Sequence, residues 1–245
     1  MRTTRIFIDQ PVRVGSDVTL PDTATAHLLR VLRLREGDAC VLFNGDGHDY
    51  PATLLRADKR GGTVRIDDRL SVDVESPLHI LLLQGIARGE KMDLILQKAT
   101  ELGVASIIPV DSERSEVKLD AQRLQKRLAH WRGVVTAACE QSGRAVIPTV
   151  QPPESLADAC TSLPDSALRL TLDPQAVHGI ADLPSNIANP VVIAIGPEGG
   201  WSPRDRSQLT AHGFSGLRLG PRILRTETAG LAAIAALQAR FGDLG

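Results

Sequence analysis

The first third of the chain carries short runs of β-prone residues separated by turn residues. Asn44-Gly45-Asp46-Gly47 and Arg60-Gly61-Gly62 have the composition of hairpin turns. Short strands at this spacing are typical of a small barrel or sandwich. One helix over about 22–33 should interrupt them, because Asp22 can cap apolar residues that recur at helical spacing. The predicted strands cover 5–8, 18–20, 39–43, 52–56 and 63–66.

From Pro77 onward, apolar strand-like runs alternate with helical stretches. This alternation predicts a mostly parallel sheet with helices on both faces, so we expect an α/β domain. The acidic, proline-containing stretch 73–77 marks the boundary, which predicts domains at 1–75 and 76–245. The expected strands are 78–83, 106–110, 168–172, 191–195 and 217–219, and the expected helices are 91–102, 121–140, 204–212 and 226–241.

The composition of the 245 residues, 42% hydrophobic and 23% charged, is that of an ordinary globular protein. The apolar stretch at the amino end is too short for a signal peptide, and 228–237 falls short of the roughly 20 residues that a spanning helix needs. We therefore expect a cytoplasmic protein with no membrane partner. Three widely spaced cysteines and six scattered histidines form no disulfide or zinc pattern, so we also expect no metal.

The formal net charge of −1 and the 3% of aromatic residues give no general argument for a nucleic-acid partner. Any RNA contact must come from local patches. Arg30 and Arg33 are three apart on the expected short helix and share a face. Together with Arg2 and Arg5 they are candidates to follow a phosphate backbone, the alternative being a plain solvated surface.

The strongest local signal is an uninterrupted apolar strand, 191–195, that runs into the loop Gly196-Pro197-Glu198-Gly199-Gly200. Ser202 and Pro203 then begin a helix, as its N-cap and its first residue. In open α/β sheets, ligands bind beyond the carboxyl ends of the strands, where glycine lets the backbone approach them. The loop is therefore predicted to bind a ligand, the alternative being a tight turn without one.

A second loop of the same kind follows the short strand 217–219, with Gly220-Pro221 as its turn and a helix after it. Two such loops, one helix apart, are expected to line one cleft. Thr226 and Thr228 can cap the following helix, and Glu227 is favourable at its positive end.

Two arginines of this second loop, Arg222 and Arg225, are harder to explain as helix caps. A cation near the amino end of a helix opposes the helix dipole. Their positions therefore favour an anionic or polar partner.

These loops carry a family resemblance. Gly196 to Gly200, followed by 219–228, resembles the paired cofactor loops of the RsmE family within the SPOUT methyltransferases. Residues 88–92, 97–103 and 140–144 resemble further blocks of that family, and 27–33 resembles its amino-terminal domain. The resemblance covers essentially the whole chain, with Trp201 and Asp205 as small departures from the family pattern.

The resemblance implies a PUA-like β-barrel at the amino end and a SPOUT α/β domain whose carboxyl-terminal segment forms a trefoil knot. It further implies a homodimer that uses S-adenosyl-L-methionine to methylate N3 of a specific uridine in 16S ribosomal RNA, within the small ribosomal subunit. Two other functions stay open from the residues alone: a nucleotide-binding or phosphoryl-handling α/β enzyme, and a non-catalytic RNA-binding adaptor.

The final helix is apolar on nearly every face over 228–237, and a helix of that kind has to be buried all round. We therefore expect it at or near the interface of a homodimer, the alternative being burial within one subunit.

Carried over by position, the resemblance assigns the cofactor-binding residues and part of the RNA-binding set. The cofactor set is Ile195, Gly196, Pro197, Glu198, Gly199, Gly200, Leu217, Leu219, Gly220, Ile223, Leu224, Arg225 and Thr228. The RNA set joins Arg88, Lys91 and Arg144, from blocks that the resemblance places beside the substrate, to the four arginines of the charge pattern above, Arg2, Arg5, Arg30 and Arg33.

Methylation of a uridine at N3 requires loss of a proton that is mostly still bound at neutral pH, so the site must favour the anionic base. Arg225 is the candidate for this task, because it lies in the second loop. Glu198 or Glu227 would accept the proton or hold Arg225 in place. The alternative is that Arg225 only anchors its loop through an ion pair.

Overall fold

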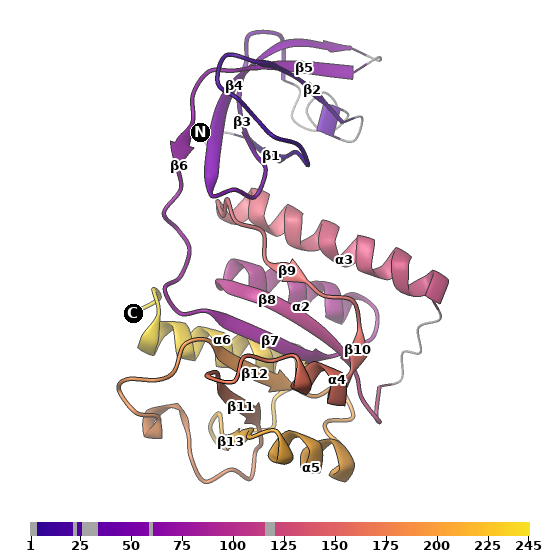
Figure 1. The fold of residues 1–245 in the computed structure, drawn as a ribbon, viewed down its shortest axis with the longest axis vertical. Helices are drawn as coiled ribbons and strands as arrows, with labels where there is room; N and C mark the ends of the chain where they lie inside the picture. Colours follow the sequence, from indigo (N-terminus) through magenta and orange to yellow (C-terminus); the bar gives the residue numbers. More distant parts are fainter. Residues whose placement is uncertain (1–3, 22–23, 26–33, 59–60, 116–120) are drawn as a thin grey trace. The chain divides into compact units, whose positions relative to one another are not determined.

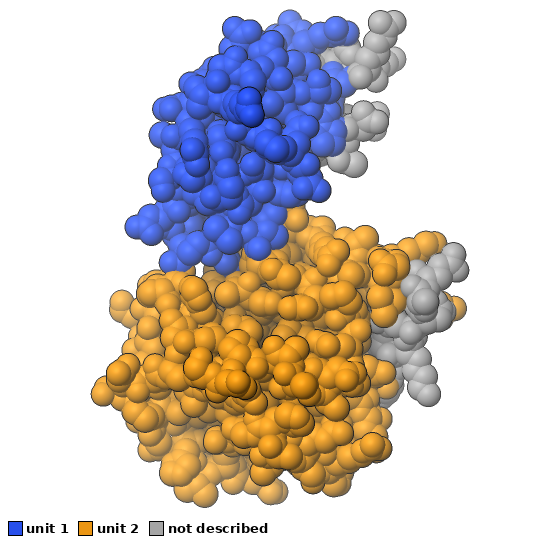
Figure 2. Space-filling model, in the orientation of Figure 1, with its two compact units in different colours: residues 1–75, 139–147 blue, residues 76–138, 148–245 orange. Residues whose placement is uncertain are grey.

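The computed structural model describes residues 4–21, 24–25, 34–58, 61–115 and 121–245. It divides into two compact units, which Figure 2 shows in different colours. The first unit comprises Met1–Glu75 and Cys139–Ile147, and the second comprises Ser76–Ala138 and Pro148–Gly245. The chain therefore returns to its first unit in 139–147, a segment that the expected boundary at 73–77 did not assign to it. Most of the helix expected over 22–33 lies outside the described residues.

The first unit is built on a largely antiparallel sheet (Figure 1). Its strands are β1 (Arg5–Phe7), β2 (Asp17–Leu20), β3 (Ala39–Phe43), β4 (His48–Asp58), β5 (Gly61–Ile66) and β6 (Leu70–Ser71). They follow the order β1-β3-β4-β5-β2, with β6 paired to β4. Because side chains alternate across a strand, every second residue of β5 points into a core that includes Ile8, Leu42, Leu54 and Ile66. The predicted β-rich amino-terminal unit is confirmed.

The second unit holds a parallel sheet in the order β10-β8-β7-β12-β11-β13, with β9 paired to β8. The strands are β7 (Ile80–Gly85), β8 (Val104–Asp111), β9 (Thr149–Val150), β10 (Glu154–Ser155), β11 (Leu168–Leu172), β12 (Val191–Ile195) and β13 (Ser215–Leu217). All five residues of β12 are buried, as a central strand covered on both faces requires.

Helices cover both faces of this sheet (Figure 1). They are α2 (Glu90–Glu101), α3 (Ala121–Ser142), α4 (Leu156–Thr161), α5 (Pro203–Ala211) and α6 (Thr226–Phe241), with a short 3-10 turn, η2 (Ile180–Asp182). On one face, Leu83 and Ala194 pack with Leu156 of α4 and Leu209 of α5. On the other face, α6 contacts β7, β12 and α2. The predicted α/β architecture is confirmed, whereas the short helix α4 was not anticipated.

Parallel strands bring their carboxyl ends to one edge of a sheet. Ile195, Leu172 and Leu217 end β12, β11 and β13, so the loops that follow these strands meet at that edge. The site described next is built there. Among the described residues, none of the helices has the length and apolar character needed to cross a membrane.

Candidate active site

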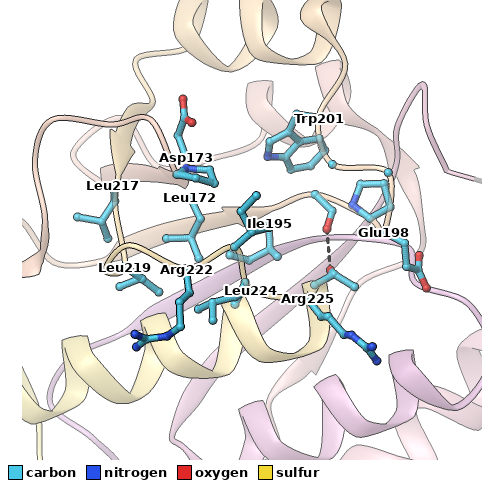
Figure 3. Close-up of a pocket in the computed structure, with 18 of the residues that line it drawn as sticks. Leu172, Asp173, Ile195, Glu198, Trp201, Leu217, Leu219, Arg222, Leu224 and Arg225 are labelled. Atoms are coloured by element: carbon cyan, nitrogen blue, oxygen red, sulfur yellow. Dashed lines mark hydrogen bonds between the residues drawn. The ribbon is translucent and has the colours of Figure 1, made fainter.

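A pocket of about 450 Å³ lies at this edge (Figure 3), within the size range of ligand pockets. Both glycine loops line it, as the sequence predicted. The lining residues are Lys91, Leu172, Asp173, Pro174, Ile195, Gly196, Pro197, Glu198, Gly199, Gly200, Trp201, Arg206, Leu217, Leu219, Gly220, Arg222, Ile223, Leu224, Arg225, Thr226 and Ala229.

Of the residues expected to bind the cofactor, Thr228 does not line the pocket. It is exposed in the first turn of α6, and its amide donates to the carbonyl oxygen of Arg225 at 2.9 Å. Because Thr228 is the third residue of α6 and lies off the pocket lining, its contact with the cofactor stays a prediction. The other members of the expected set all line the cavity.

The sequence reasoning missed one wall of the pocket, which Leu172, Asp173 and Pro174 form after β11. A signal was present, because the strand over 168–172 was expected and its carboxyl end had to reach the same edge. Asp173 also pairs with Arg206 at 3.2 Å on the pocket lining. Trp201 was noted only as a departure from the family pattern, yet it lines the cavity and its Nε1 donates to Thr171 Oγ1 at 3.1 Å.

Each glycine loop has one glycine whose backbone is not covered by neighbouring side chains. A Cβ atom added to Gly200 or to Gly220 would meet no atom within 4 Å, and both residues line the pocket. Their φ angles of 64° and 69° lie in the left-handed region that favours glycine. A ligand can therefore approach these two peptide units directly.

Gly199 has a different reason to be glycine. An added Cβ would lie 3.2 Å from Cβ of Arg114, whose Nη1 donates to the Gly199 carbonyl oxygen at 2.8 Å. The close neighbour of Gly199 is therefore a loop after β8. A side chain at Gly199 would therefore meet Arg114 first, although Gly199 also lines the pocket.

Glu198 of the first loop binds the beginning of α2. Its Oε1 accepts from the Arg88 amide at 3.1 Å and lies 3.3 Å from Lys91 Nζ. Partial burial alone would raise the pKa of this carboxyl, but the amide hydrogen bonds and the Lys91 ammonium together hold it below its usual value. A carboxylate with a lowered pKa is a weaker proton acceptor than an ordinary one. Glu198 holds Lys91 rather than Arg225.

Arg225 is the N-cap residue of α6, and its side chain is exposed. Its guanidinium makes no hydrogen bond or ion pair with any residue that the structure describes, so the anchoring ion pair that was the alternative is not formed. Figure 3 shows the side chains of Arg222 and Arg225 leaving the second loop in different directions. Glu227 does not line the pocket, and its Oε2 is buried without a partner in the described part of the chain.

Thr226 does not cap α6 as expected. Its Oγ1 instead donates to the carbonyl oxygen of Gly196 at 2.6 Å, so the second loop is tied to the first. The helix begins at Thr226 with no side-chain cap, whereas α5 has the expected N-cap at Ser202, which forms a capping box with Asp205.

Known proteins match this sequence and geometry over their full lengths. A family model for the RNA methyltransferase domain matches residues 74–238, and one for the RNA methyltransferase PUA domain matches residues 20–67. The ribosomal RNA small subunit methyltransferase E of Buchnera aphidicola subsp. Schizaphis graminum is 35% identical over 99% of this chain and 98% of that protein. The chain belongs to the ribosomal RNA small subunit methyltransferase E family.

Solved structures agree with this assignment. The ribosomal RNA small subunit methyltransferase E of Neisseria gonorrhoeae, crystallised with S-adenosyl methionine, matches with a TM-score of 0.95 at 40% identity, covering 100% of both chains. A Legionella pneumophila protein in complex with the same cofactor matches equally well, with a TM-score of 0.95 at 40% identity over 100% of both chains. The resemblance to the RsmE family is confirmed, and with it the RNA methyltransferase class and the PUA-like unit.

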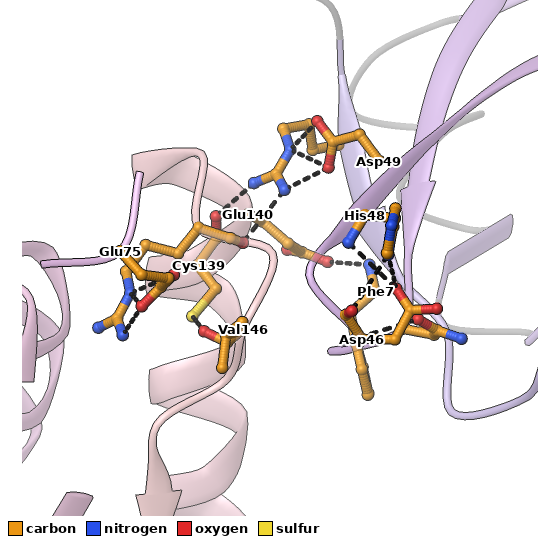
Figure 4. Close-up of polar contacts among 11 residues, drawn as sticks. Phe7, Asp46, His48, Asp49, Glu75, Cys139, Glu140 and Val146 are labelled. Atoms are coloured by element: carbon orange, nitrogen blue, oxygen red, sulfur yellow. Dashed lines mark hydrogen bonds and ion pairs between the residues drawn. The ribbon is translucent and has the colours of Figure 1, made fainter. Parts of the chain in front are cut away.

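Two arginines expected to bind RNA, Arg5 and Arg144, have largely buried side chains in the first unit, and Figure 4 labels their partners Asp49, Cys139 and Glu75. Arg5 pairs with Asp49 at 2.6 Å, donates to the Cys139 carbonyl oxygen at 2.7 Å and lies 4.5 Å from the centre of the Phe43 ring. Arg144 pairs with Glu75, and its side chain is 6% exposed. Both guanidinium groups are committed to internal partners, which corrects the expectation that they contact phosphate.

The remaining expected RNA residues fall into two groups. Lys91 lines the pocket and pairs with Glu198, while Arg88 contacts Glu198 through its backbone amide. Arg2, Arg30 and Arg33 lie outside the described residues. Within the described ranges there is no group of three or more His, Cys, Asp or Glu residues that could hold a metal ion.

Proposed function

We propose that this chain transfers the methyl group of S-adenosyl-L-methionine to N3 of a specific uridine in 16S ribosomal RNA. The observation that carries the proposal is that both glycine loops and the amino end of α6 line one pocket, with Lys91, Arg222 and Arg225 on its lining. Membership of the ribosomal RNA small subunit methyltransferase E family supports the substrate class.

The residues present fit the cofactor. Apolar side chains of Leu172, Ile195 and Leu219 would hold its apolar parts, while the exposed backbone of Gly200 and Gly220 offers polar groups at close range. This combination of an apolar lining with a few fixed polar groups is typical of cofactor sites. When bound, the cofactor supplies an electrophilic methyl group.

The residues of this chain then have to orient the base and favour its anionic form. Arg225 is suited to the second task, because its exposed guanidinium has no protein partner among the described residues and can face negative charge that develops on the uracil oxygens. Glu198 keeps Lys91 and the beginning of α2 beside the pocket. With Glu198 a weaker base than usual and Glu227 outside the pocket, the proton of N3 would leave to solvent.

RNA binding is proposed for two regions. Lys91 supplies positive charge on the pocket lining, where a phosphate of the substrate would be attracted, and Arg88, whose amide binds Glu198, is the neighbouring candidate. The amino-terminal domain, proposed as 1–75, would position the RNA for the catalytic domain, 76–245. The PUA family match to residues 20–67 supports that division of labour.

We propose a cytoplasmic homodimer, with the carboxyl-terminal segment knotted as the family resemblance implies. The dimer is supported by α6, in which Ala233, Ile234 and Leu237 are buried while Leu231, Ala232, Ala235 and Ala236 remain half-buried in a single chain. A second copy packed on these half-buried residues would complete the burial that an apolar helix requires. Light scattering should report a dimer at micromolar concentration, and a monomer would contradict this part of the proposal.

The function is tested by ligand-dependent thermal unfolding, since a ligand that binds the native state raises its stability. S-adenosylhomocysteine should raise the unfolding temperature, and ATP should leave it unchanged. Stabilisation by ATP alone would support a nucleotide-binding enzyme, and stabilisation by neither would support an RNA-binding adaptor.

A further inference from the structure

Gln84 is a polar residue inside an apolar strand, since β7 has the sequence Ile-Leu-Leu-Leu-Gln-Gly. Its side chain is fully buried, with 0% exposure. Burying an amide is unfavourable unless it forms hydrogen bonds. Gln84 Nε2 donates to the Gly85 carbonyl oxygen at 2.9 Å and to Thr226 Oγ1 at 3.1 Å.

The hydroxyl of Thr226 continues this chain of hydrogen bonds. A hydroxyl donates one hydrogen and accepts others, so Thr226 Oγ1 accepts from Gln84 and donates to the Gly196 carbonyl oxygen at 2.6 Å, the dashed line in Figure 3. The relay Gln84–Thr226–Gly196 therefore connects the end of β7, the beginning of α6 and the first glycine loop. These three segments are far apart in the sequence.

This relay lies directly behind the pocket. Gly196 and Thr226 both line the cavity, whereas Gln84 does not. In the described part of the chain, the Thr226–Gly196 bond is the sole hydrogen bond between the loop 195–201 and the segment 217–229. The spacing of the two loops therefore depends on one hydroxyl and on the amide that orients it.

We propose that Gln84 and Thr226 are positioning residues that hold the two glycine loops at the separation the cofactor requires. This inference rests on the proposed function, because it assigns the pocket to S-adenosylmethionine. Gln84 touches neither the pocket nor the reacting atoms, so it acts through Thr226.

If Gln84 only stabilised the fold, a substitution would lower cofactor affinity only as far as it lowered the unfolding temperature. A suitable substitution of Gln84 separates these two effects. Its Oε1 is buried without a partner among the described residues. An unsatisfied buried acceptor is unfavourable, so replacing the amide by the similarly shaped methionine side chain removes that penalty together with the hydrogen bonds that Nε2 donates. Gln84→Met should therefore unfold at a temperature close to that of the wild type, yet bind the cofactor product less tightly.

The experiment is calorimetric titration of the full chain with S-adenosylhomocysteine, with thermal unfolding of each variant in parallel. Thr226→Val keeps the shape and removes the hydroxyl, Thr226→Ser restores it, and Thr100→Val is the control. Thr100 is also buried, with 0% exposure against 7% for Thr226, and its Oγ1 donates to the Leu96 carbonyl oxygen at 2.7 Å within α2, away from the pocket.

Loss of one buried hydrogen bond should weaken binding about ten-fold in Thr226→Val and at least about three-fold in Gln84→Met. Thr226→Ser and Thr100→Val should bind within about two-fold of the wild type, even where Thr100→Val lowers the unfolding temperature. Because both substitutions break one relay, the double variant Gln84→Met/Thr226→Val should bind no more weakly than Thr226→Val alone.

Wild-type affinity in folded Thr226→Val and Gln84→Met proteins would overturn the inference. The inference would also be overturned if, across the four single variants including Thr100→Val, the loss of affinity simply paralleled the drop in unfolding temperature. A wild-type chain that binds no S-adenosylhomocysteine would instead contradict the proposed function, so the two failures are distinguishable.

Discussion

A Cβ atom on Gly85 would lie 2.6 Å from both the ring nitrogen and Cδ of Pro197. The end of β7 is therefore in direct contact with the first glycine loop. Because the neighbouring atoms belong to a proline ring and to backbone, they cannot move aside as the end of a flexible side chain would.

Gly85→Ala should displace the loop 196–200 and weaken S-adenosylhomocysteine binding by at least about ten-fold, since overpacking of this kind typically destabilises by about 1–3 kcal/mol. Calorimetric titration measures the change. Gly133→Ala is the matched control, because Gly133 lies within α3 and an added Cβ there meets nothing within 4 Å. Equal affinity in the two variants would contradict the assigned contact.

Arg225→Lys keeps the charge but loses the planar guanidinium, and Arg225→Ala loses both. If Arg225 stabilises the anionic base, both variants should methylate more slowly in single-turnover assays, by about 100-fold for Arg225→Ala, while binding S-adenosylhomocysteine almost normally. Wild-type rates in both folded variants would remove Arg225 from the mechanism. The search would then move to Arg88 and Lys91, because Arg144 is committed to Glu75.

Glu198→Gln tests the assignment of this carboxylate as an anchor. Because the pKa of Glu198 in the folded protein is lowered from its ordinary value of 4.5, its interactions stabilise the protein above that pH and are lost as the pH falls through the lowered value. The wild type should therefore unfold at a higher temperature than Glu198→Gln at pH 7, and the difference should vanish in acid.

The same variant should methylate with a weaker apparent affinity for RNA, because Lys91 loses its partner, but with an unchanged pH dependence of its maximal rate. Disappearance of an ionisation from that pH profile would identify Glu198 as the proton acceptor after all.

Arg144→Leu tests whether this arginine binds RNA or stabilises the first unit. Removing it leaves Glu75 without its partner, so urea unfolding should report a loss of about 2 kcal/mol, as for other partly buried charged hydrogen bonds. Arg204→Ala, which removes an exposed arginine from α5, should change the stability by less than about 0.5 kcal/mol. Normal stability with weakened RNA binding would restore the original expectation for Arg144.

The sequence predicted the parts of this site that depend on local pattern. A buried apolar strand followed by Gly196-Pro197 is typical of a ligand-binding loop in a parallel sheet. Because the strands are parallel, both glycine loops lie at the same edge of the sheet. Contacts between distant segments leave no such trace. Nothing in the composition of β7 indicates that Gln84 binds Thr226. Likewise, nothing in β1 indicates that Arg5 binds the Cys139 carbonyl oxygen near the end of α3.

Charge was the least informative feature of the sequence. A pattern of arginines near the amino end does not distinguish a guanidinium that binds phosphate from one that pairs with an internal carboxylate. Only the burial of the side chain distinguishes the two. Arg5 was therefore assigned to RNA from the charge pattern and Arg144 from the family resemblance, although both form internal ion pairs. The segment 139–147 explains the error, because its return to the first unit, where it supplies Arg144 and the carbonyl of Cys139, could not be read from chain order.

The central claim is tested most directly by methylation of small ribosomal subunits whose 16S RNA lacks the modification. The purified chain and S-adenosyl-L-methionine should convert one uridine to its N3-methyl form, which mass spectrometry of the digested RNA resolves from methylation at other positions. Thr226→Val should give the same product at a higher half-saturating concentration of cofactor. Methylation at a ribose 2′-hydroxyl or at a carbon of the base, or no methylation of 16S RNA at all, would contradict the account.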